Sequence, residues 1–197
     1  MNQKHLDAPD WSKIPAPIGD EDLSHLLKYK IKPIELKSTN NYLINLSEIK
    51  GLSVIYIYPM TGIPNKPDPN GWDNIPGARG CTPQSCSFRD NFSHLKKLNV
   101  SIFGLSTQTT EYQKEMVERL HLPFPVLSDE KLEFAKQLNL PVFEVENMKL
   151  IKRITLVLNN NKIIKYFYPV FPPDKNVIDV IKFLVNNQDY IPNLYAI

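Results

Sequence analysis

The sequence predicts an α/β protein whose central sheet contains both parallel and antiparallel strands. Residues 52–58 and 100–106 are largely apolar runs, typical of strands buried on both faces, and segments with helical periodicity lie between them. A later pair of apolar runs, 153–158 and 163–168, flanks a polar turn and predicts a β-hairpin. Strands connected by helices, followed by a hairpin and a final helix, favour a mixed sheet flanked by helices.

The remaining elements follow from turn, cap and periodicity signals. Residues 33–46 contain two short apolar runs around a polar turn, which predicts an early hairpin. Thr82 is a suitable N-cap and Pro83 a suitable first residue for a helix that continues to about Leu98. Further elements are expected in this order: a short helix over 20–29, a helix over 110–121, a strand or turn at 126–129, and helices over 130–138 and 175–186.

Residues 59–80 interrupt this pattern with a long segment rich in proline and glycine. The segment holds five prolines and four of the chain's seven glycines. Structureless loops longer than about 12–15 residues are uncommon and are usually functional or disordered. Trp72, inside the segment, indicates that part of it packs against the protein. We expect one domain over residues 1–197, with 1–30 as an N-terminal extension and 59–80 as a long loop.

Composition favours a soluble globular protein and argues against several classes. The chain is 42% hydrophobic and 22% charged, and its net charge of +2, spread over scattered lysines, gives no reason to expect nucleic acid. The first residues carry charge and proline where a signal peptide needs an apolar stretch. The longest apolar run, 54–58, is too short to span a bilayer. We therefore expect a cytoplasmic protein without a membrane or nucleic-acid partner.

The two cysteines of the chain, Cys81 and Cys86, are badly placed for a static disulfide if one helix contains both. Their Cα atoms would be roughly 8.6 Å apart, with side chains about 140° apart around the helix. Beyond about 7 Å a disulfide cannot close without backbone movement. The helical pattern places Cys81 on the apolar stripe that contains Phe88, and it turns Cys86 toward water beside Arg89.

These two sulfurs favour redox chemistry over a purely structural or metal-binding role. In a reducing cytosol a disulfide is usually transient or catalytic. Zinc usually takes four ligands, and the histidines that would complete a site are dispersed, so no metal or cofactor is expected. Cys81 falls at a predicted helix start, where the helix dipole stabilises a thiolate, although Pro83 removes one amide donor. The alternative is that both are small buried hydrophobic residues. The histidines are His5, His25, His94 and His121.

The segment from Gly80 to Asp90 resembles the active-site helix of peroxiredoxins, most closely the peroxiredoxin Q or bacterioferritin-comigratory protein group. That group shows a Gly-Cys-Thr start, an acid or amide three residues after the first cysteine, a second cysteine at plus five, and Arg-Asp after it. The resemblance extends over about residues 30–186 and implies a thioredoxin-like fold. Other similar stretches are the Tyr-Pro that ends residues 52–59, Gly104-Leu-Ser106, Pro125-Val-Leu-Ser-Asp129 and Arg153-Ile-Thr-Leu-Val-Leu158.

The resemblance implies a thiol peroxidase that reduces H2O2 or organic hydroperoxides. Cys81 would attack the peroxide and become a sulfenic acid, and Cys86 would resolve it as a transient disulfide after local unfolding. Arg153 would hold Cys81 ionised and polarise the peroxide, with Gln84 as a hydrogen-bond partner. An exposed Arg153 and a solvent-facing Gln84 are the alternatives. The expected partners are a peroxide and a thioredoxin-like dithiol reductant, and the expected state is a monomer or weak homodimer.

The sequence departs from the family immediately before Cys81. The family usually has Pro-x-x-x-Thr-x-x-Cys, whereas Asn74 and Ala78 stand at the proline and threonine positions here. Thr61 resembles the missing threonine, separated from Cys81 by an inserted stretch. Three alternatives are open: Thr61 folds back to the thiol, Thr82 substitutes for it, or the site uses no hydroxyl.

A second alignment with the family would make Cys86 the attacking thiol. The pieces Pro76-Gly-Ala78, Thr82-Pro83 and Cys86-Ser87 resemble the Pro-Gly-Ala-Phe-Thr-Pro-x-Cys-Ser string of another peroxiredoxin branch. Extra residues interrupt the string here, so this alignment ranks second. Arg79 would supply a local cation in either one.

Two further function classes remain open at this point. One is a thioredoxin-fold protein that binds Cu(I) through two cysteines and a distant histidine, although the C-x4-C spacing fits it poorly. The other is a redox sensor that reports oxidation to a partner without efficient peroxidase turnover. The sequence does not separate the sensor from the enzyme because the same thiol chemistry serves both.

Overall fold

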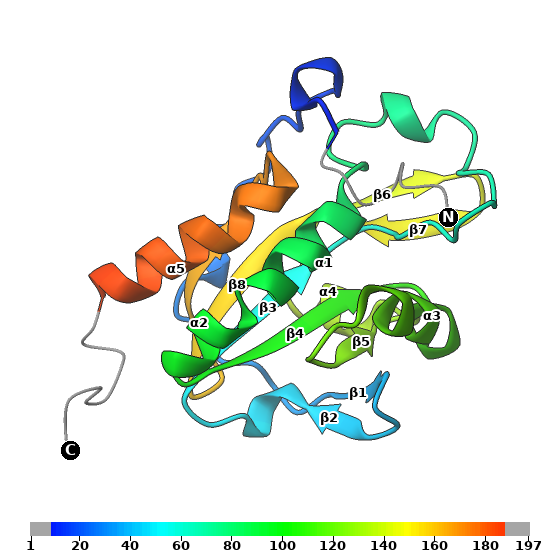
Figure 1. Ribbon diagram of the computed structural model, residues 1–197. Helices are drawn as coiled ribbons and strands as arrows, with labels where there is room; N and C mark the ends of the chain where they lie inside the picture. Colours follow the sequence, from blue (N-terminus) through cyan, green and yellow to red (C-terminus); the bar gives the residue numbers. More distant parts are fainter. Residues whose placement is uncertain (1–8, 188–197) are drawn as a thin grey trace.

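A computed structural model describes residues 9–187 and contains a seven-stranded sheet in the order β2-β1-β5-β4-β3-β8-β9 (Figure 1). In this sheet β3 pairs in parallel with β4, and β4 with β5, whereas every other pair is antiparallel. The predicted mixed sheet is therefore confirmed. Its strands are β1 (Glu35–Ser38), β2 (Leu43–Asn45), β3 (Leu52–Ile57), β4 (Val100–Ser106), β5 (Val126–Ser128), β8 (Ile154–Asn159) and β9 (Lys162–Phe167).

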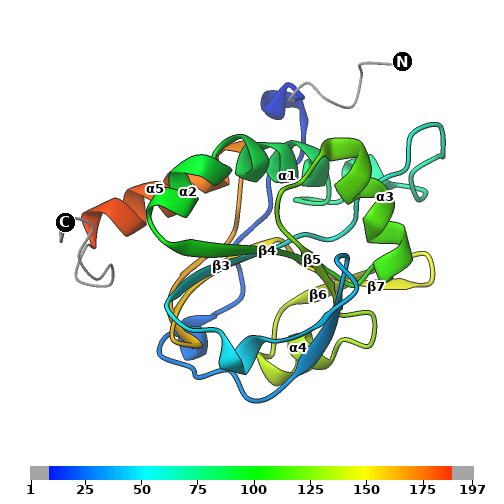
Figure 2. The same cartoon turned by 60° about the horizontal axis from the view of Figure 1, so that its bottom comes forward.

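Helices cover both faces of this sheet, as Figure 2 shows: α1, α2, α3 and α5 lie on one side and α4 on the other. Helices α3, α4 and α5 form where the sequence predicts them, although α4 is shorter than the expected 130–138. None of the helices within residues 9–187 has the length and apolar character that a membrane crossing requires. The helices are α1 (Cys81–Asp90), α2 (Phe92–Lys97), α3 (Thr110–Leu120), α4 (Glu133–Gln137) and α5 (Asn176–Asn186).

Strand β3 is buried at every residue because it separates two apolar cores. Val54 and Tyr56 face the core beneath α1, α3 and α5, while Ile55 and Ile57 face the core that contains Phe134 of α4. Successive side chains of a strand point to opposite faces of the sheet. The uninterrupted apolar run of this strand thus reflects cover on both faces.

The predicted helix over 20–29 is wrong, since only Ser24–Leu26 forms a short 3₁₀ turn. Lys28 takes a left-handed conformation with φ of 68°. Its N–H donates to the Ile163 carbonyl at 2.8 Å, and the Ile163 N–H donates to the Tyr29 carbonyl at 2.9 Å. Backbone groups that bond to β9 are no longer available to a helix.

The predicted start and length of the helix that carries the cysteines also need correction. Thr82 is not the N-cap: α1 begins at Cys81, two residues before the predicted first residue Pro83, and Gly80 is its N-cap with φ of 101°, a conformation that favours glycine. The helix also stops before its predicted end. Asn91 separates α1 from α2, and its Nδ2 donates to the Ser87 carbonyl at 2.9 Å. A side chain that bonds to a nearby helix carbonyl offers the backbone an alternative to continuing the helix.

The long segment 59–80 packs on a two-stranded hairpin that the sequence did not predict. Its strands are β6 (Val142–Val145) and β7 (Met148–Ile151), and their turn, Glu146-Asn147, lacks glycine and proline. Trp72 is 5% exposed and belongs to an apolar cluster with residues of this hairpin. The prediction that Trp72 packs down is confirmed.

The first described residues, 9–20, run across the loop that precedes α1, and we call this segment the strap. The Gly77 N–H donates to the carbonyl of Pro15 in the strap at 3.2 Å. A Cβ added to Gly80 would meet a ring atom of Trp11 at 2.7 Å, so the indole lies directly against the N-cap of α1. The strap therefore covers the residues immediately before Cys81.

Candidate active site

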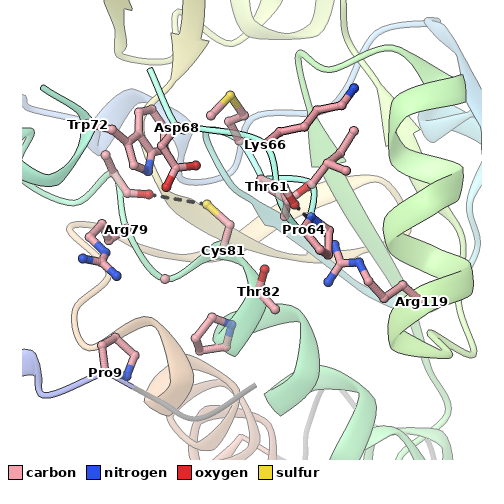
Figure 3. Close-up of a pocket in the computed structure, with 16 residues that line it drawn as sticks. Pro9, Thr61, Pro64, Lys66, Asp68, Trp72, Arg79, Cys81, Thr82 and Arg119 are labelled. Atoms are coloured by element: carbon pink, nitrogen blue, oxygen red, sulfur yellow. Dashed lines mark hydrogen bonds between the residues drawn. The ribbon is translucent and has the colours of Figure 1, made fainter. Parts of the chain in front are cut away.

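Cys81 is the first residue of α1, and its side chain is almost buried, with 4% exposed. The thiol donates to the Ala78 carbonyl at 3.5 Å, the contact drawn as a dashed line in Figure 3. The N-terminus of a helix carries unpaired amide groups and the positive end of the dipole, both of which favour a negative charge. This position suits a thiolate.

Arg153 is the residue immediately before β8, a strand that pairs along its length with β3, and its side chain reaches Cys81. Its Nη2 lies 3.1 Å from Cys81 Sγ and also donates to the carbonyls of Ala78 and Arg79, each at 3.1 Å. The side chain is 3% exposed, so Arg153 is not an ordinary surface cation. A buried guanidinium in contact with the sulfur favours the charged form of the thiol.

Gln84 is fully buried and faces Arg153, so the solvent-facing alternative is wrong. Its Oε1 accepts from Arg153 Nη1 at 2.5 Å. At the other end of the amide, Nε2 donates to Asn176 Oδ1 at 3.1 Å. The sequence predicted the contact with Arg153, but it gave no indication of Asn176, which lies in α5.

Cys86 does not face water as predicted, because its side chain is only 8% exposed and belongs to the core beneath α1. The helical pattern did not predict this burial, in which Cys86 shares a core cluster with Leu120, the last residue of α3, and with Leu122. Arg89 donates from Nη1 to the Leu120 carbonyl at 2.8 Å, which brings α1 and the end of α3 together beside Cys86. Burial raises the pKa of the Cys86 thiol, and the positive charge of Arg89 offsets this only in part. Both cysteines are free thiols.

A pocket of about 150 Å³ opens beside Cys81, and Figure 3 shows the side chains that line it. Thr61 and Thr82 both line this pocket. The structure therefore brings Thr61 back to the thiol across the long segment 59–80. Thr61 is 1% exposed, whereas Thr82 is half-buried on the first turn of α1.

Three side chains near this pocket were not predicted from the sequence. Gln108 holds Thr61 from both sides: Oε1 accepts from the Thr61 N–H at 2.9 Å, and Nε2 donates to the Thr61 carbonyl at 3.0 Å. Tyr112 Oη donates to the same carbonyl at 2.9 Å, and Arg119 lines the pocket from α3. The available signal was the polar run 107–110 directly after β4, since ligands of open α/β sheets bind at the carboxyl ends of strands.

Metal ligands are not gathered in the part of the chain that the structure describes. Within residues 9–187 no three His, Cys, Asp or Glu side chains lie close enough together to hold a metal ion. His25 uses its Nε2 in a 3.0 Å hydrogen bond with the Leu138 carbonyl. His5 lies outside the described residues.

Sequence comparison connects the chain with one protein family and with named peroxiredoxins. A family model described as Redoxin matches residues 21–181. Peroxiredoxin Q, chloroplastic, of Sedum lineare is 31% identical over 156 residues, which is 77% of this chain and 74% of that protein. Peroxiredoxin Q, chloroplastic, of Oryza sativa subsp. japonica is 30% identical over 151 residues, or 76% of this chain and 62% of the longer rice protein.

Solved structures show the same fold at lower sequence identity. Peroxidoxin BcpB of Mycobacterium tuberculosis superposes with a TM-score of 0.67 at 22% identity, covering 82% of this chain and 97% of that protein. The bacterioferritin comigratory protein of Xanthomonas campestris, studied for its alkyl peroxide reduction activity, gives a TM-score of 0.61 at 16% identity. That match covers 78% of this chain and 90% of the Xanthomonas protein. These matches confirm the thioredoxin-like fold.

The family match covers most of the chain, and it includes the helix with both cysteines and the strand that Arg153 precedes. The Sedum relative exceeds 30% identity over most of its length. The copper-binding alternative is not favoured by these relatives. The chain belongs to the redoxin family, as a peroxiredoxin of the peroxiredoxin Q and bacterioferritin-comigratory protein group.

Proposed function

We propose that this thiol peroxidase uses Cys81 as the attacking thiolate and Cys86 as the resolving thiol. The observation that carries the assignment is the 3.1 Å contact between Arg153 Nη2 and Cys81 Sγ at the N-terminus of α1. The thiolate is the nucleophile in such chemistry, and the cation and the helix terminus both favour it. Burial raises the pKa of Cys86, which keeps that residue a thiol at neutral pH. This contrast supports Cys81 over the second alignment.

The reaction proceeds in three balanced steps. The Cys81 thiolate attacks one oxygen of ROOH, the O–O bond breaks, and RO⁻ leaves and takes up a proton as ROH, so Cys81 becomes a sulfenic acid. The Cys86 sulfur then attacks Cys81 Sγ and loses its proton, and the sulfenic hydroxyl departs as water to leave a disulfide. An external dithiol is oxidised in turn and returns both cysteines to thiols.

We assign the peroxide-orienting hydroxyl to Thr61 rather than to Thr82. Thr61 Oγ1 donates its own proton to Gln108 Oε1 at 3.2 Å, which leaves its lone pairs for the O–H of a peroxide. Gln108 and Tyr112 also hold the backbone of Thr61 by hydrogen bonds. Thr82 has no such support in the described contacts. A fixed acceptor beside the thiolate holds a peroxide in the geometry of attack.

Disulfide formation requires the first turns of α1 to unwind. Both cysteines lie in this one helix, where a spacing of five residues separates Cα atoms by roughly 8.6 Å. A disulfide needs the Cα atoms within about 7 Å. The folded helix is therefore the form that attacks peroxide, and a locally unfolded form carries the disulfide.

We further propose a thioredoxin-like dithiol as the reductant, a monomer or weak homodimer as the working state, and a reducing cytosol as the compartment. Family membership supports the dithiol, because a disulfide in a peroxiredoxin is returned to thiols by exchange with another thiol pair. Turnover with thioredoxin as the only reductant, sedimentation of the pure chain, and imaging of the tagged full chain test these three points in turn. Efficient turnover also separates the enzyme from a redox sensor that reacts once.

The assignment is tested by treating reduced protein with one equivalent of H2O2 and following its intact mass. Wild type should lose two hydrogens much faster than free cysteine reacts, and Cys86→Ser should instead gain one oxygen. Cys81→Ser should react no faster than free cysteine. Rapid reaction of Cys81→Ser would establish the second alignment, and a wild-type rate equal to that of free cysteine would overturn the proposal.

A further inference from the structure

We propose that Asn176 is a positioning residue for the peroxidatic centre, and that it acts on Arg153 by fixing which end of the Gln84 amide faces the guanidinium. The inference deepens the proposed function, because it rests on Arg153 and Cys81 forming the reactive pair. Asn176 lies at the start of α5 and does not line the pocket beside Cys81.

A continuous chain of buried hydrogen bonds connects Asn176 to the sulfur. Asn176 Oδ1 accepts from Gln84 Nε2 at 3.1 Å, Gln84 Oε1 accepts from Arg153 Nη1 at 2.5 Å, and Arg153 Nη2 lies 3.1 Å from Cys81 Sγ. All four side chains are at most 4% exposed. Water therefore competes little for any of these bonds.

The glutamine amide needs a fixed orientation because its two ends have opposite roles. The carbonyl oxygen accepts hydrogen bonds, whereas the NH2 group only donates. A guanidinium also only donates, so a flipped Gln84 would place its NH2 against Arg153 and lose the 2.5 Å bond. Asn176 Oδ1 accepts from Nε2 and so directs Oε1 toward Arg153. With that acceptor removed, both orientations of Gln84 become accessible.

Asn176 itself is held in the orientation that this task requires. Thr155 Oγ1 donates to the same Oδ1 at 2.6 Å, so Asn176 presents its oxygen to both neighbours. Thr155 belongs to β8, two residues after Arg153, which ties the arrangement to the strand that carries the guanidinium. Helix capping does not explain Asn176, because α5 has no side-chain cap and its N-cap is Lys175.

The test compares Asn176→Ala with Asn186→Ala, an exposed asparagine on the same helix, as matched control. The rates of the reduced proteins with H2O2 and with iodoacetamide are measured at one pH. Both reagents consume the thiolate, but only the peroxide needs an oriented guanidinium. We expect Asn176→Ala to slow the H2O2 reaction about tenfold, which corresponds to the loss of one or two buried hydrogen bonds. Alkylation should fall less than about threefold.

A second substitution distinguishes positioning from general support of the fold. In a Gln84→Glu background the carboxylate has no wrong orientation, because both of its ends accept. Asn176→Ala should therefore have little further effect on the H2O2 rate there. An equal tenfold loss in both backgrounds would overturn the inference, as would an unchanged rate in Asn176→Ala alone.

Two further results keep the inference separate from folding and from the proposed function. If Asn176→Ala does not fold, Asn176→Ser, too short to reach Gln84 Nε2, takes its place with the same expectations. Thermal unfolding of each variant shows that folded protein is being compared. A fast wild type with unaffected Asn176 variants refutes only this inference, whereas a slow wild type refutes the proposed function.

Discussion

Replacing Arg153 with Met removes the one cation in contact with Cys81 Sγ among the described residues, and its effect can be estimated from the structure. At the observed 3.1 Å, two unit charges attract by about 5 kcal/mol in an effective dielectric of about 20, which is an upper bound. Hydrogen bonds to charged groups contribute about 1.5–3 kcal/mol net. At about 1.4 kcal/mol per factor of ten, Arg153→Met should slow the reaction with H2O2 by about tenfold to 150-fold.

The assay is single-turnover oxidation of reduced protein by H2O2, with thermal unfolding in parallel. A stability loss is also expected, because Arg153 donates to the buried carbonyl of Ala78 and the partly buried carbonyl of Arg79. The rates are therefore compared well below the melting temperature. Lys162→Met, which removes an exposed cation from β9, is the control and should match wild type. A folded Arg153→Met protein within threefold of wild type would refute the electrostatic reasoning.

Three other substitutions or conditions give outcomes of known direction. Thr61→Val should slow H2O2 reduction about fivefold to tenfold, because one hydrogen bond to the peroxide is lost. Alkylation of Cys81 by iodoacetamide should be unchanged, and an equal loss of rate in both assays would contradict an orienting role. Because burial raises the pKa of Cys86, unfolded protein ionises this thiol first as the pH rises. The resulting contribution to the stability of Cys81→Ser is fully present below the ordinary pKa of a thiol, and it is lost as the pH rises through the raised pKa of Cys86 in the folded protein. Urea unfolding at a series of pH values measures this loss, and Cys86 should be alkylated slowly at neutral pH. Trp11 of the strap packs on Gly80 and so restrains the first turn of α1. Trp11→Ala should therefore speed disulfide formation without changing the rate of the first oxidation step, both measured by rapid-quench mass spectrometry. Slower disulfide formation would contradict this restraint.

The sequence predicted those parts of the fold that depend on local pattern. The apolar run of β3 and the turn between β8 and β9 depend on side-chain alternation and turn residues, which neighbouring residues determine. The helix predicted over 20–29 is only a short turn at Ser24–Leu26, because the backbone of Lys28 and Tyr29 bonds to β9, far along the chain. Long-range pairing of this kind leaves no trace in a local window of sequence.

The candidate site likewise has parts that local sequence predicted and parts that depend on contacts between distant residues. The order of residues in α1 suggested which cysteine lies at the helix terminus, and the family resemblance pointed to Arg153. The burial of Cys86 was not predicted, because the core cluster that it joins includes residues distant in sequence, such as Leu120 and Leu122. Asn176 was not predicted either, since a buried asparagine in α5 cannot be distinguished from an exposed one by its neighbours in sequence.

The interruption of the helix at Asn91 has a consequence for how the reductant meets the enzyme. Unwinding that begins at Cys81 can end at this break, so α2 keeps its contacts with β4 while α1 rearranges. Oxidised and reduced molecules would then differ in shape over one short stretch of surface. A reductant that recognises the rearranged stretch is not occupied by the reduced molecules, which are in excess in a reducing compartment. The rate at which the reductant reduces the disulfide would then depend on the concentration of the oxidised enzyme and not on that of the reduced enzyme.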